Sequence, residues 1–196
     1  MFILYGVVVA VVVGVLLGGR LEPLAELRLR WPWLAISGLV FQVVLFSAPV
    51  TAVIGAAGPP LYVVSTVLVL ATVVRNLAVP GLAAVAAGAV SNLAAILANG
   101  GYMPASPAAL AFAGKLPAAT YSNSRVDPAP ALAPLTDIFA LPAWMPFANV
   151  FSVGDILIGL GIATAILWVV LRRAARASSP VSNSTDGLYG PAQGES

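Results

Sequence analysis

Five long apolar runs constrain the fold of this chain more than any other feature of its sequence. They cover residues 2–19, 33–51, 59–75, 79–98 and 152–171. Each run is close to the ~20 residues that cross a bilayer as a helix. The runs are continuous and rich in Ala, Leu and Val, with no alternation of apolar and polar residues, which favours helices over membrane-spanning strands. We therefore expect an all-α integral membrane protein with about five transmembrane helices.

The composition agrees with a multi-pass protein of the cell membrane. Hydrophobic residues make up 60% of the 196 residues and charged residues only 8%, and the mean hydropathy is +1.00. Soluble domains carry about 25% charged residues, so this chain has too few to cover a surface that faces water. Membrane lipids are thus the first expected partner. A net charge of +2 is too small to predict a nucleic-acid partner.

The chain contains neither cysteine nor histidine. Their absence excludes disulfides, thiol catalysis, histidine-based metal sites and a Ser-His-Asp triad. We expect no cofactor and no metal site. Any chemistry must use carboxylates, hydroxyls, amides or the few basic residues.

The positions of the basic residues predict how the chain is threaded. Cytoplasmic loops carry an excess of Lys and Arg, and seven of the nine basic residues fall on one side if the amino terminus faces out and the carboxyl terminus faces in. These seven are Arg20, Arg28, Arg30, Arg75, Arg172, Arg173 and Arg176. The stretch 21–30 then lies on the inner surface. It fits a solvated loop that sets the topology better than a lipid-recognition patch.

The fourth and fifth runs are separated by a long outer segment, residues 99–151. It holds eight prolines and almost no charge, and it is too apolar for simple disorder. We expect it to fold against the outer face of the bundle, with a short helix over 106–114 that starts at Ser106-Pro107 and ends at Gly114. Residues 1–173 would form the bundle and residues 174–196 a disordered cytoplasmic tail.

Small residues recur at helical spacing in two of the runs. Gly14 and Gly18 form a GxxxG pair, and Ala84 and Gly88 have the same spacing. Such spacing lets helix backbones approach closely in lipid. It favours either a compact bundle or a homo-oligomer.

Asp155 places a carboxylate in the first turn of the fifth run. One interpretation is structural, because Ser152-Val-Gly-Asp155 has the form of a capping box, in which each side chain bonds the other's backbone amide. The other is functional, because ionisable groups in membrane segments commonly mark a site. Asp137, the other acidic residue in an apolar outer context, has the same two interpretations, as a turn residue or a site residue.

Several other polar residues are also candidates for structural or ligand-binding roles. Gln42 and Asn92 lie within apolar runs and suit hydrogen bonds between helices. Asn99 follows the fourth run. Arg75 and Asn76 end the third run, where we expect them to anchor to phosphate headgroups.

The motifs NGGYMP at 99–104 and FSVGD at 151–155, together with several shorter ones, occur in an order that resembles a family of bacterial multi-pass membrane proteins known only as a domain of unknown function. The resemblance covers most of residues 1–172, and its most specific parts are NGGYMP at 99–104 and FSVGD at 151–155. Thr136 departs from the family, where a glycine is expected. The other motifs are Gly18-Gly19-Arg20-Leu21, Arg75-Asn76, Tyr121-Ser122-Asn123, and Asp137-Ile138 with Leu141-Pro142.

The sequence is also similar in part to the lipoprotein (type II) signal peptidases. Residues 89–93 are similar to their G-N-L motif, and residues 151–155 to their F-N-x-A-D motif. This resemblance implies that Asp155 is half of a catalytic dyad. The second aspartate expected after Gly100-Gly101 is missing, and Ile96 stands where an arginine is expected. Asp137 is the remaining candidate for the partner.

Three functions follow from these observations. The leading one is a non-catalytic bundle that binds a lipid, peptide or protein partner at its outer face. The second is an aspartyl membrane enzyme that uses Asp155 with Asp137, in which both carboxylates face one site and one has a raised pKa. The third is a small-solute transporter, which requires a polar path through Gln42 and Asn92.

Overall fold

The structure is a computed structural model that describes residues 2–115 and 124–177, with side chains up to Arg172. It is mostly helical, as expected. The five longer helices in the described residues are α1 (Phe2–Leu16), α3 (Pro32–Leu45), α5 (Gly58–Arg75), α6 (Leu82–Ala98) and α8 (Val153–Ala177). The shorter helical elements are α2 (Glu22–Ala25), α4 (Ala48–Thr51), η1 (Gly55–Ala57), α7 (Pro107–Phe112) and η2 (Ala133–Leu135). The strands are β1 (Met103–Ala105), β2 (Ser124–Val126), β3 (Phe139–Ala140) and β4 (Val150–Phe151).

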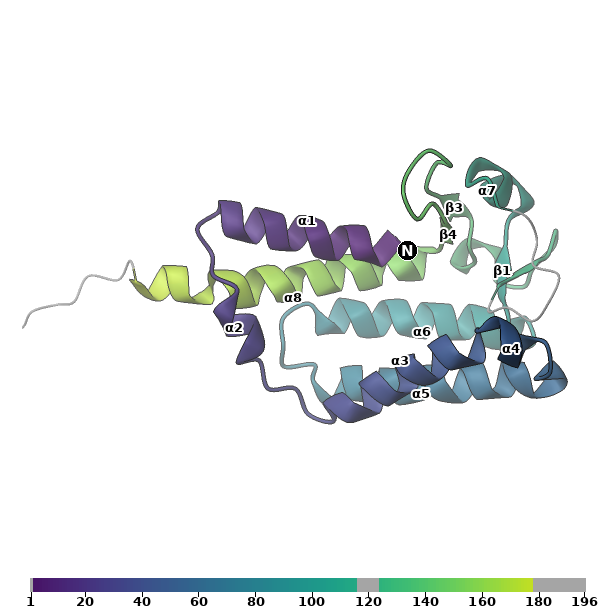
Figure 1. Cartoon of the computed structure of the whole chain (residues 1–196), viewed down its shortest axis with the longest axis horizontal. Helices are drawn as coiled ribbons and strands as arrows, with labels where there is room; N and C mark the ends of the chain where they lie inside the picture. Colours follow the sequence, from purple (N-terminus) through teal and green to yellow (C-terminus); the bar gives the residue numbers. More distant parts are fainter. Residues whose placement is uncertain (1, 116–123, 178–196) are drawn as a thin grey trace, which may run out of the picture.

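The long helices pack as a row in the order α1, α8, α6, α5 and α3 (Figure 1). The described strands and α7 lie at one end of the bundle along the helix axes, and we call this the loop-bearing end. At the opposite end, α1 and α5 terminate and α2 lies beside α8. We call this the arginine end. It carries Arg20, Arg28, Arg30, Arg75 and Arg172.

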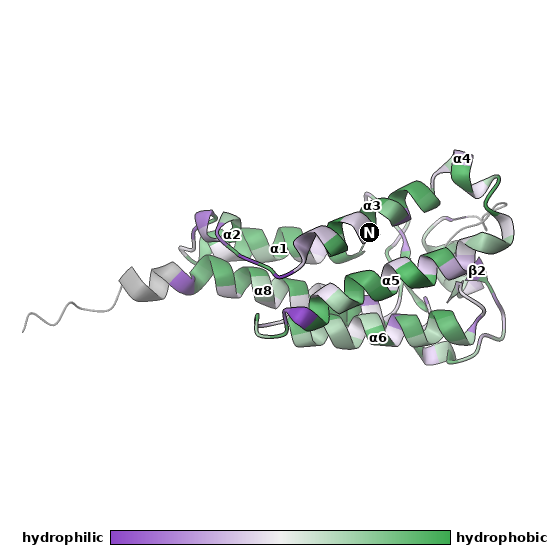
Figure 2. Ribbon diagram, turned by 90° about the horizontal axis from the view of Figure 1, so that it is seen from below, coloured by the Kyte–Doolittle hydropathy of each residue, from purple (hydrophilic) through white to green (hydrophobic). Residues whose placement is uncertain are grey.

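Most of the helical surface is apolar and is not covered by the rest of the chain. Two segments, Gly55–Arg75 and Val153–Arg172, are long and apolar enough to cross a membrane. Within an apolar stretch of 18 residues in each, only 17% and 28% of the residues are buried. Phe2–Leu16, Pro32–Leu45 and Leu82–Ala98 are apolar but shorter. Figure 2 shows hydrophobic residues along the helices and hydrophilic ones mainly near their ends. This pattern indicates a membrane location, whereas the five spans and their orientation stay predictions.

Proline and glycine shift several of the predicted boundaries. The run 33–51 does not form one helix, because α3 ends at Leu45 and a separate turn, α4, contains Pro49. A proline inside a helix removes a hydrogen bond and clashes with the preceding turn. The run 79–98 becomes helical only at Leu82, after Pro80-Gly81. At the other extreme, α8 continues to Ala177, so the first residues of the predicted tail are helical.

Glycines set the close packing of α8 against its two neighbours. A methyl group on Gly88 would lie 2.4 Å from the Gly154 carbonyl oxygen, and one on Gly161 would lie 2.5 Å from that of Gly81. On α1, Gly14 faces Val170. The predicted GxxxG contact is therefore only half correct, because Gly18 has no neighbour within 4 Å. Its positive φ of 83° instead ends the helix.

The segment between α6 and α8 folds at the loop-bearing end, as expected. β1 pairs in parallel with β2, and β3 pairs antiparallel with β4 so that Phe139 lies opposite Phe151. The predicted helix appears as α7, preceded by Ser106, although the Ser106 side chain makes no capping bond. Tyr121-Ser122-Asn123 and the tail beyond Ala177 lie outside the described residues.

Candidate functional site at the loop-bearing end

Asn92, Ser152 and Asp155 form a closed hydrogen-bonded cluster between α6 and α8. The Asp155 backbone NH donates to Ser152 Oγ at 3.1 Å, and the Ser152 backbone NH donates to Asp155 Oδ2 at 3.1 Å. These two bonds confirm the capping box. Asn92 extends it, since its Nδ2 donates to Asp155 Oδ1 at 2.9 Å and its Oδ1 accepts from Ser152 Oγ at 2.8 Å. The cluster therefore caps α8 and ties α6 to it.

Gly154 allows this cluster to form. A methyl group on Gly154 would lie 1.9 Å from Asn92 Oδ1, so no other residue fits beside the amide. Ser152 is fully buried. Because buried polar groups are costly unless they are hydrogen-bonded, the fixed partners of Ser152 keep this end of α8 in one arrangement.

Asp137 is held beside this cluster by backbone hydrogen bonds to the chain around β1. Its NH donates to the Pro104 carbonyl oxygen at 2.9 Å, and its own carbonyl oxygen accepts from the Ser106 NH at 3.0 Å. The preceding residue, Thr136, is buried and donates its hydroxyl to the Ala133 carbonyl oxygen at 2.8 Å. Asp137 thus sits in a fixed loop, with only 8% of its surface exposed.

The Asp137 carboxylate makes no hydrogen bond to the part of the chain that the structure describes. Burial first, and then the negative charge of Asp155, raise the pKa of Asp137 from its ordinary value of 3.8 to about 7. The charge of Asp155 therefore acts on the Asp137 carboxyl group, and their joint role as a dyad stays a prediction. A carboxyl group with this pKa can hold or release a proton near neutral pH.

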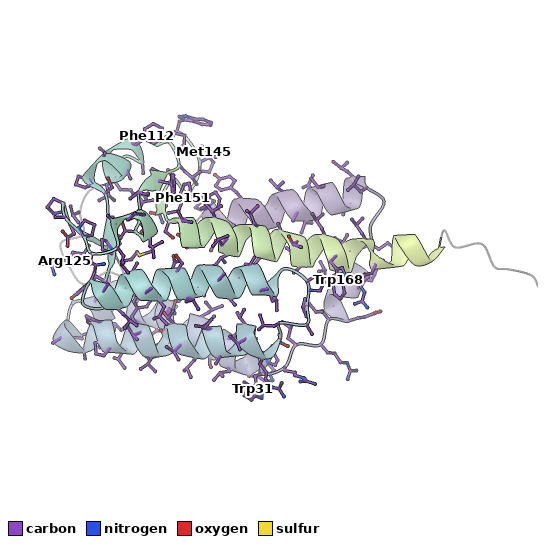
Figure 3. The ribbon with its side chains drawn as sticks, turned by 180° about the vertical axis from the view of Figure 1, so that it is seen from behind. Trp31, Phe112, Arg125, Met145, Phe151 and Trp168 are labelled. Carbon is purple, nitrogen blue, oxygen red and sulfur yellow. The ribbon has the colours of Figure 1, made fainter. Side chains whose placement is uncertain are left out.

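Aromatic rings border the start of α8. The Phe151 ring stacks on Phe2 of α1 with centroids 4.3 Å apart, and on Phe139 of β3 with centroids 5.7 Å apart. Figure 3 shows Phe151 at the loop-bearing end, together with Phe112 and Met145. The hydroxyl of Tyr5 also donates to the Pro146 carbonyl oxygen. These contacts join α1 to the loops and give the surroundings of Asp155 an apolar side.

Two further polar residues from the sequence analysis have structural partners elsewhere. The Gln42 amide donates to Ser65 Oγ at 3.1 Å and to Thr66 Oγ1 at 3.4 Å, which confirms the predicted bond between helices for the pair α3 and α5. The Asn99 side chain donates to the Ala131 carbonyl oxygen and accepts from the Ala131 NH, each at 2.9 Å. Asn99 therefore fastens the loop to the end of α6.

The headgroup role predicted for Asn76 is wrong. Asn76 is 7% exposed, and its side chain forms a pair of bonds with the Arg30 backbone, 2.7 Å from the Arg30 NH and 2.8 Å to the Arg30 carbonyl oxygen. It clamps the chain before α3 onto the end of α5. Arg75 remains exposed, with its guanidinium 5.7 Å from the centre of the Trp31 ring.

The sequence analysis missed two features of the site. The backbone lock between Asp137 and Pro104 joins residues far apart in sequence, and no residue pattern announces it. The close approach of Gly88 to Gly154 had a visible signal, because both are glycines within apolar runs. Within the described residues, no group of three or more acidic side chains is arranged to hold a metal ion.

Comparison with known proteins identifies a family. The model of a family of unknown function (DUF5317) matches residues 26–167, which include Asn92, Asp137, Ser152 and Asp155. No curated protein and no solved structure matches the chain.

Proposed function

Since the chain belongs to the family of unknown function DUF5317, whose name assigns no activity, we propose from its geometry that it is an aspartyl membrane hydrolase. The observation that carries the proposal is the pair formed by Asp137 and Asp155. One carboxyl is buried without a hydrogen-bond partner in the described chain, and the charge of the other acts on it. Because of this observation, we favour the aspartyl function over the non-catalytic function that the sequence alone favoured.

Two carboxyl groups that share one proton can activate water. In the proposed reaction, the ionised carboxylate takes a proton from water while the water oxygen attacks the carbonyl carbon of a peptide bond. The protonated carboxyl polarises the carbonyl oxygen, and the bond to nitrogen breaks as the amine takes up a proton. Asn92 and the Ser152 backbone hold Asp155 in place, and the loop that binds Pro104 holds Asp137.

The proposed setting is the outer face of the cell membrane, with five spans, the amino terminus outside and the carboxyl terminus inside. Support comes from the five apolar helices and from the basic residues gathered at the arginine end. The loop-bearing end would then lie at the outer surface. The resemblance of residues 151–155 to the signal-peptidase motif makes a lipid-linked peptide the proposed class of substrate.

The test is hydrolysis of a fluorogenic lipopeptide by the full-length protein in detergent. Asp137→Asn and Asp155→Asn should each reduce the rate by at least ~100-fold, the lower range for loss of a general acid or base. The matched control is Asp127→Asn, because within the described residues that carboxylate only accepts a turn bond from the Ala129 NH. Cleavage by either site variant at the wild-type rate would exclude the dyad.

A second test uses the absence of native cysteine. If the two carboxylates form one site, the double variant Asp137→Cys/Asp155→Cys should form a disulfide in membranes. A bridge forms only between Cα atoms within ~7 Å. Asp127→Cys/Asp155→Cys serves as the control pair and should not form one. Equal crosslinking in both pairs, or none in the first, would remove the geometric basis of the proposal.

A non-catalytic binding function remains the second candidate, because the loop-bearing end carries large exposed hydrophobic side chains. Trp144 is 82% exposed, Phe147 64% and Phe112 60%. Exposed apolar groups of this kind mark contact with a partner or a membrane. If Trp144→Ser/Phe147→Ser abolishes capture of a lipopeptide that the wild type binds and does not cleave, binding replaces hydrolysis as the function.

No observation favours the transport function. Gln42 and Asn92 make their hydrogen bonds in different helix pairs, α3 with α5 and α6 with α8. Each amide is used by its immediate neighbours, and these contacts give no support to a polar path between them.

A further inference from the structure

A cavity of about 380 Å³ lies at the arginine end, between α2 and the last turns of α8. It is within the volume range of small-ligand sites. The residues that line it include two arginines, Arg28 and Arg172, together with Trp168 and apolar residues such as Leu27 and Val79. Trp168 and Trp31 both lie at this end of the bundle (Figure 3). The cavity is far from the carboxylate pair and has no role in the proposed hydrolysis.

The segment that closes the cavity is fixed to α8. The Arg20 NH donates to the Val170 carbonyl oxygen at 3.1 Å. Gly19 makes this approach feasible, because a methyl group there would lie 2.4 Å from Val170 Cγ1. Pro23 is buried and lines the cavity. The cavity is therefore built by specific contacts between the segment 19–28 and α8.

The charges in the wall favour an anion. Arg28 and Arg172 contribute two positive charges and Glu26 one negative charge, so the lining has a net charge of +1. The Arg172 guanidinium lies 4.1 Å from the centre of the Trp168 ring, a cation–π distance that orients its planar fork. Guanidinium groups bind phosphate oxygens through paired N–H donors.

We propose that this cavity binds the phosphate headgroup of an anionic phospholipid. The apolar part of the wall decides between a lipid and free phosphate. Leu27 and Val79 are apolar lining residues that an acyl chain can contact, whereas free phosphate would gain nothing from them. Basic pockets beside membrane helices at the side rich in arginine are suited to anionic headgroups.

The experiment measures binding of short-chain phosphatidylglycerol to the purified full-length protein by the change in tryptophan fluorescence. The wild type should bind it saturably, and Arg28→Gln/Arg172→Gln should weaken binding by at least ~10-fold. The matched control is Arg30→Gln/Arg75→Gln, which removes the same charge from the same end but from residues outside the cavity wall. Thermal unfolding of each variant checks that it is folded, and Arg28→Lys/Arg172→Lys keeps the charge without the planar fork and should bind with intermediate affinity.

Two other ligands distinguish binding of a phospholipid headgroup from binding of free phosphate. Short-chain phosphatidylcholine, which carries no net charge, should bind at least ~10-fold more weakly than phosphatidylglycerol, and inorganic phosphate should not compete at equal concentration. Effective competition by inorganic phosphate would overturn the lipid assignment. Equal weakening by the cavity variant and the control variant would overturn the site itself, because binding would then follow net charge alone.

Discussion

Replacing Asp137 by asparagine should stabilise the protein at neutral and alkaline pH. The side chain is buried, and its carboxylate has no hydrogen-bond partner in the described chain. The ionised form therefore loses its hydration on folding without compensation, and it also faces the charge of Asp155. An amide of nearly the same size removes the charge and keeps the shape.

The size of the effect follows from the pKa difference between the two states. The pKa of Asp137 is about 7 in the folded protein against an ordinary value of 3.8. Between these values the folded state holds a proton that the unfolded state has lost, so stability falls as pH rises. The loss is absent below pH 3.8 and complete above pH 7. At ~1.36 kcal/mol per pH unit it amounts to about 4 kcal/mol.

Thermal unfolding in detergent, followed by tryptophan fluorescence from pH 4 to pH 8, measures this directly. Asp137→Asn should match the wild type near pH 4 and exceed its melting temperature at pH 8 by on the order of 10 °C. Asp127→Asn, which changes a turn carboxylate outside the cluster, should follow the wild type throughout. A variant less stable than the wild type at pH 8, or one with the same pH dependence as the wild type, would refute the reasoning.

Three other variants test the packing and the polar contacts. Gly154→Ala should lower stability by ~1–3 kcal/mol, because the new methyl group would meet Asn92 Oδ1 at 1.9 Å; Gly6→Ala, with ordinary contacts at 3.5 Å, should leave the melting temperature nearly unchanged. If the two alanines have equal effects, close packing of α6 and α8 is not the cause. Asn92→Ala should cost ~1–3 kcal/mol by leaving the buried Ser152 hydroxyl without its acceptor, and a thermal melt that is unaltered would contradict this. Asn76→Ala should speed tryptic cleavage near Arg30, whose backbone it clamps, and cleavage at the wild-type rate would show that the clamp is dispensable.

The parts of the site that depend on local sequence could be predicted. Ser152 and Asp155 are three residues apart, and a capping box requires only that spacing at the start of a helix. The helix after Ser106 could also be predicted from local sequence, because Pro107 suits its first turn. The bond from Gln42 to the next helix followed from an amide placed in an apolar run.

The parts that depend on distant contacts could not be predicted. Nothing near Asp137 in the sequence reveals that Pro104 pairs with its backbone or that Asp155 lies close by. Asn76 adjoins an exposed arginine and has the composition of a headgroup anchor, yet its amide is buried against Arg30. Burial and long-range pairing change the role of a polar residue without changing its local pattern. The break of the second run between Leu45 and Ala48 is different, because the chemistry of Pro49 was sufficient to predict it.

The most direct test of the central claim is an infrared titration of the Asp137 carboxyl group in the full-length protein. The carbonyl band of the protonated acid is assigned by its loss in Asp137→Asn and is followed with pH in the wild type and in Asp155→Asn. The account predicts a pKa of about 7 in the wild type and a lower value in Asp155→Asn that stays above 3.8, because burial remains after the charge of Asp155 is removed. A wild-type pKa near 4, or the same value in both proteins, would contradict the claim that the two carboxylates form one site.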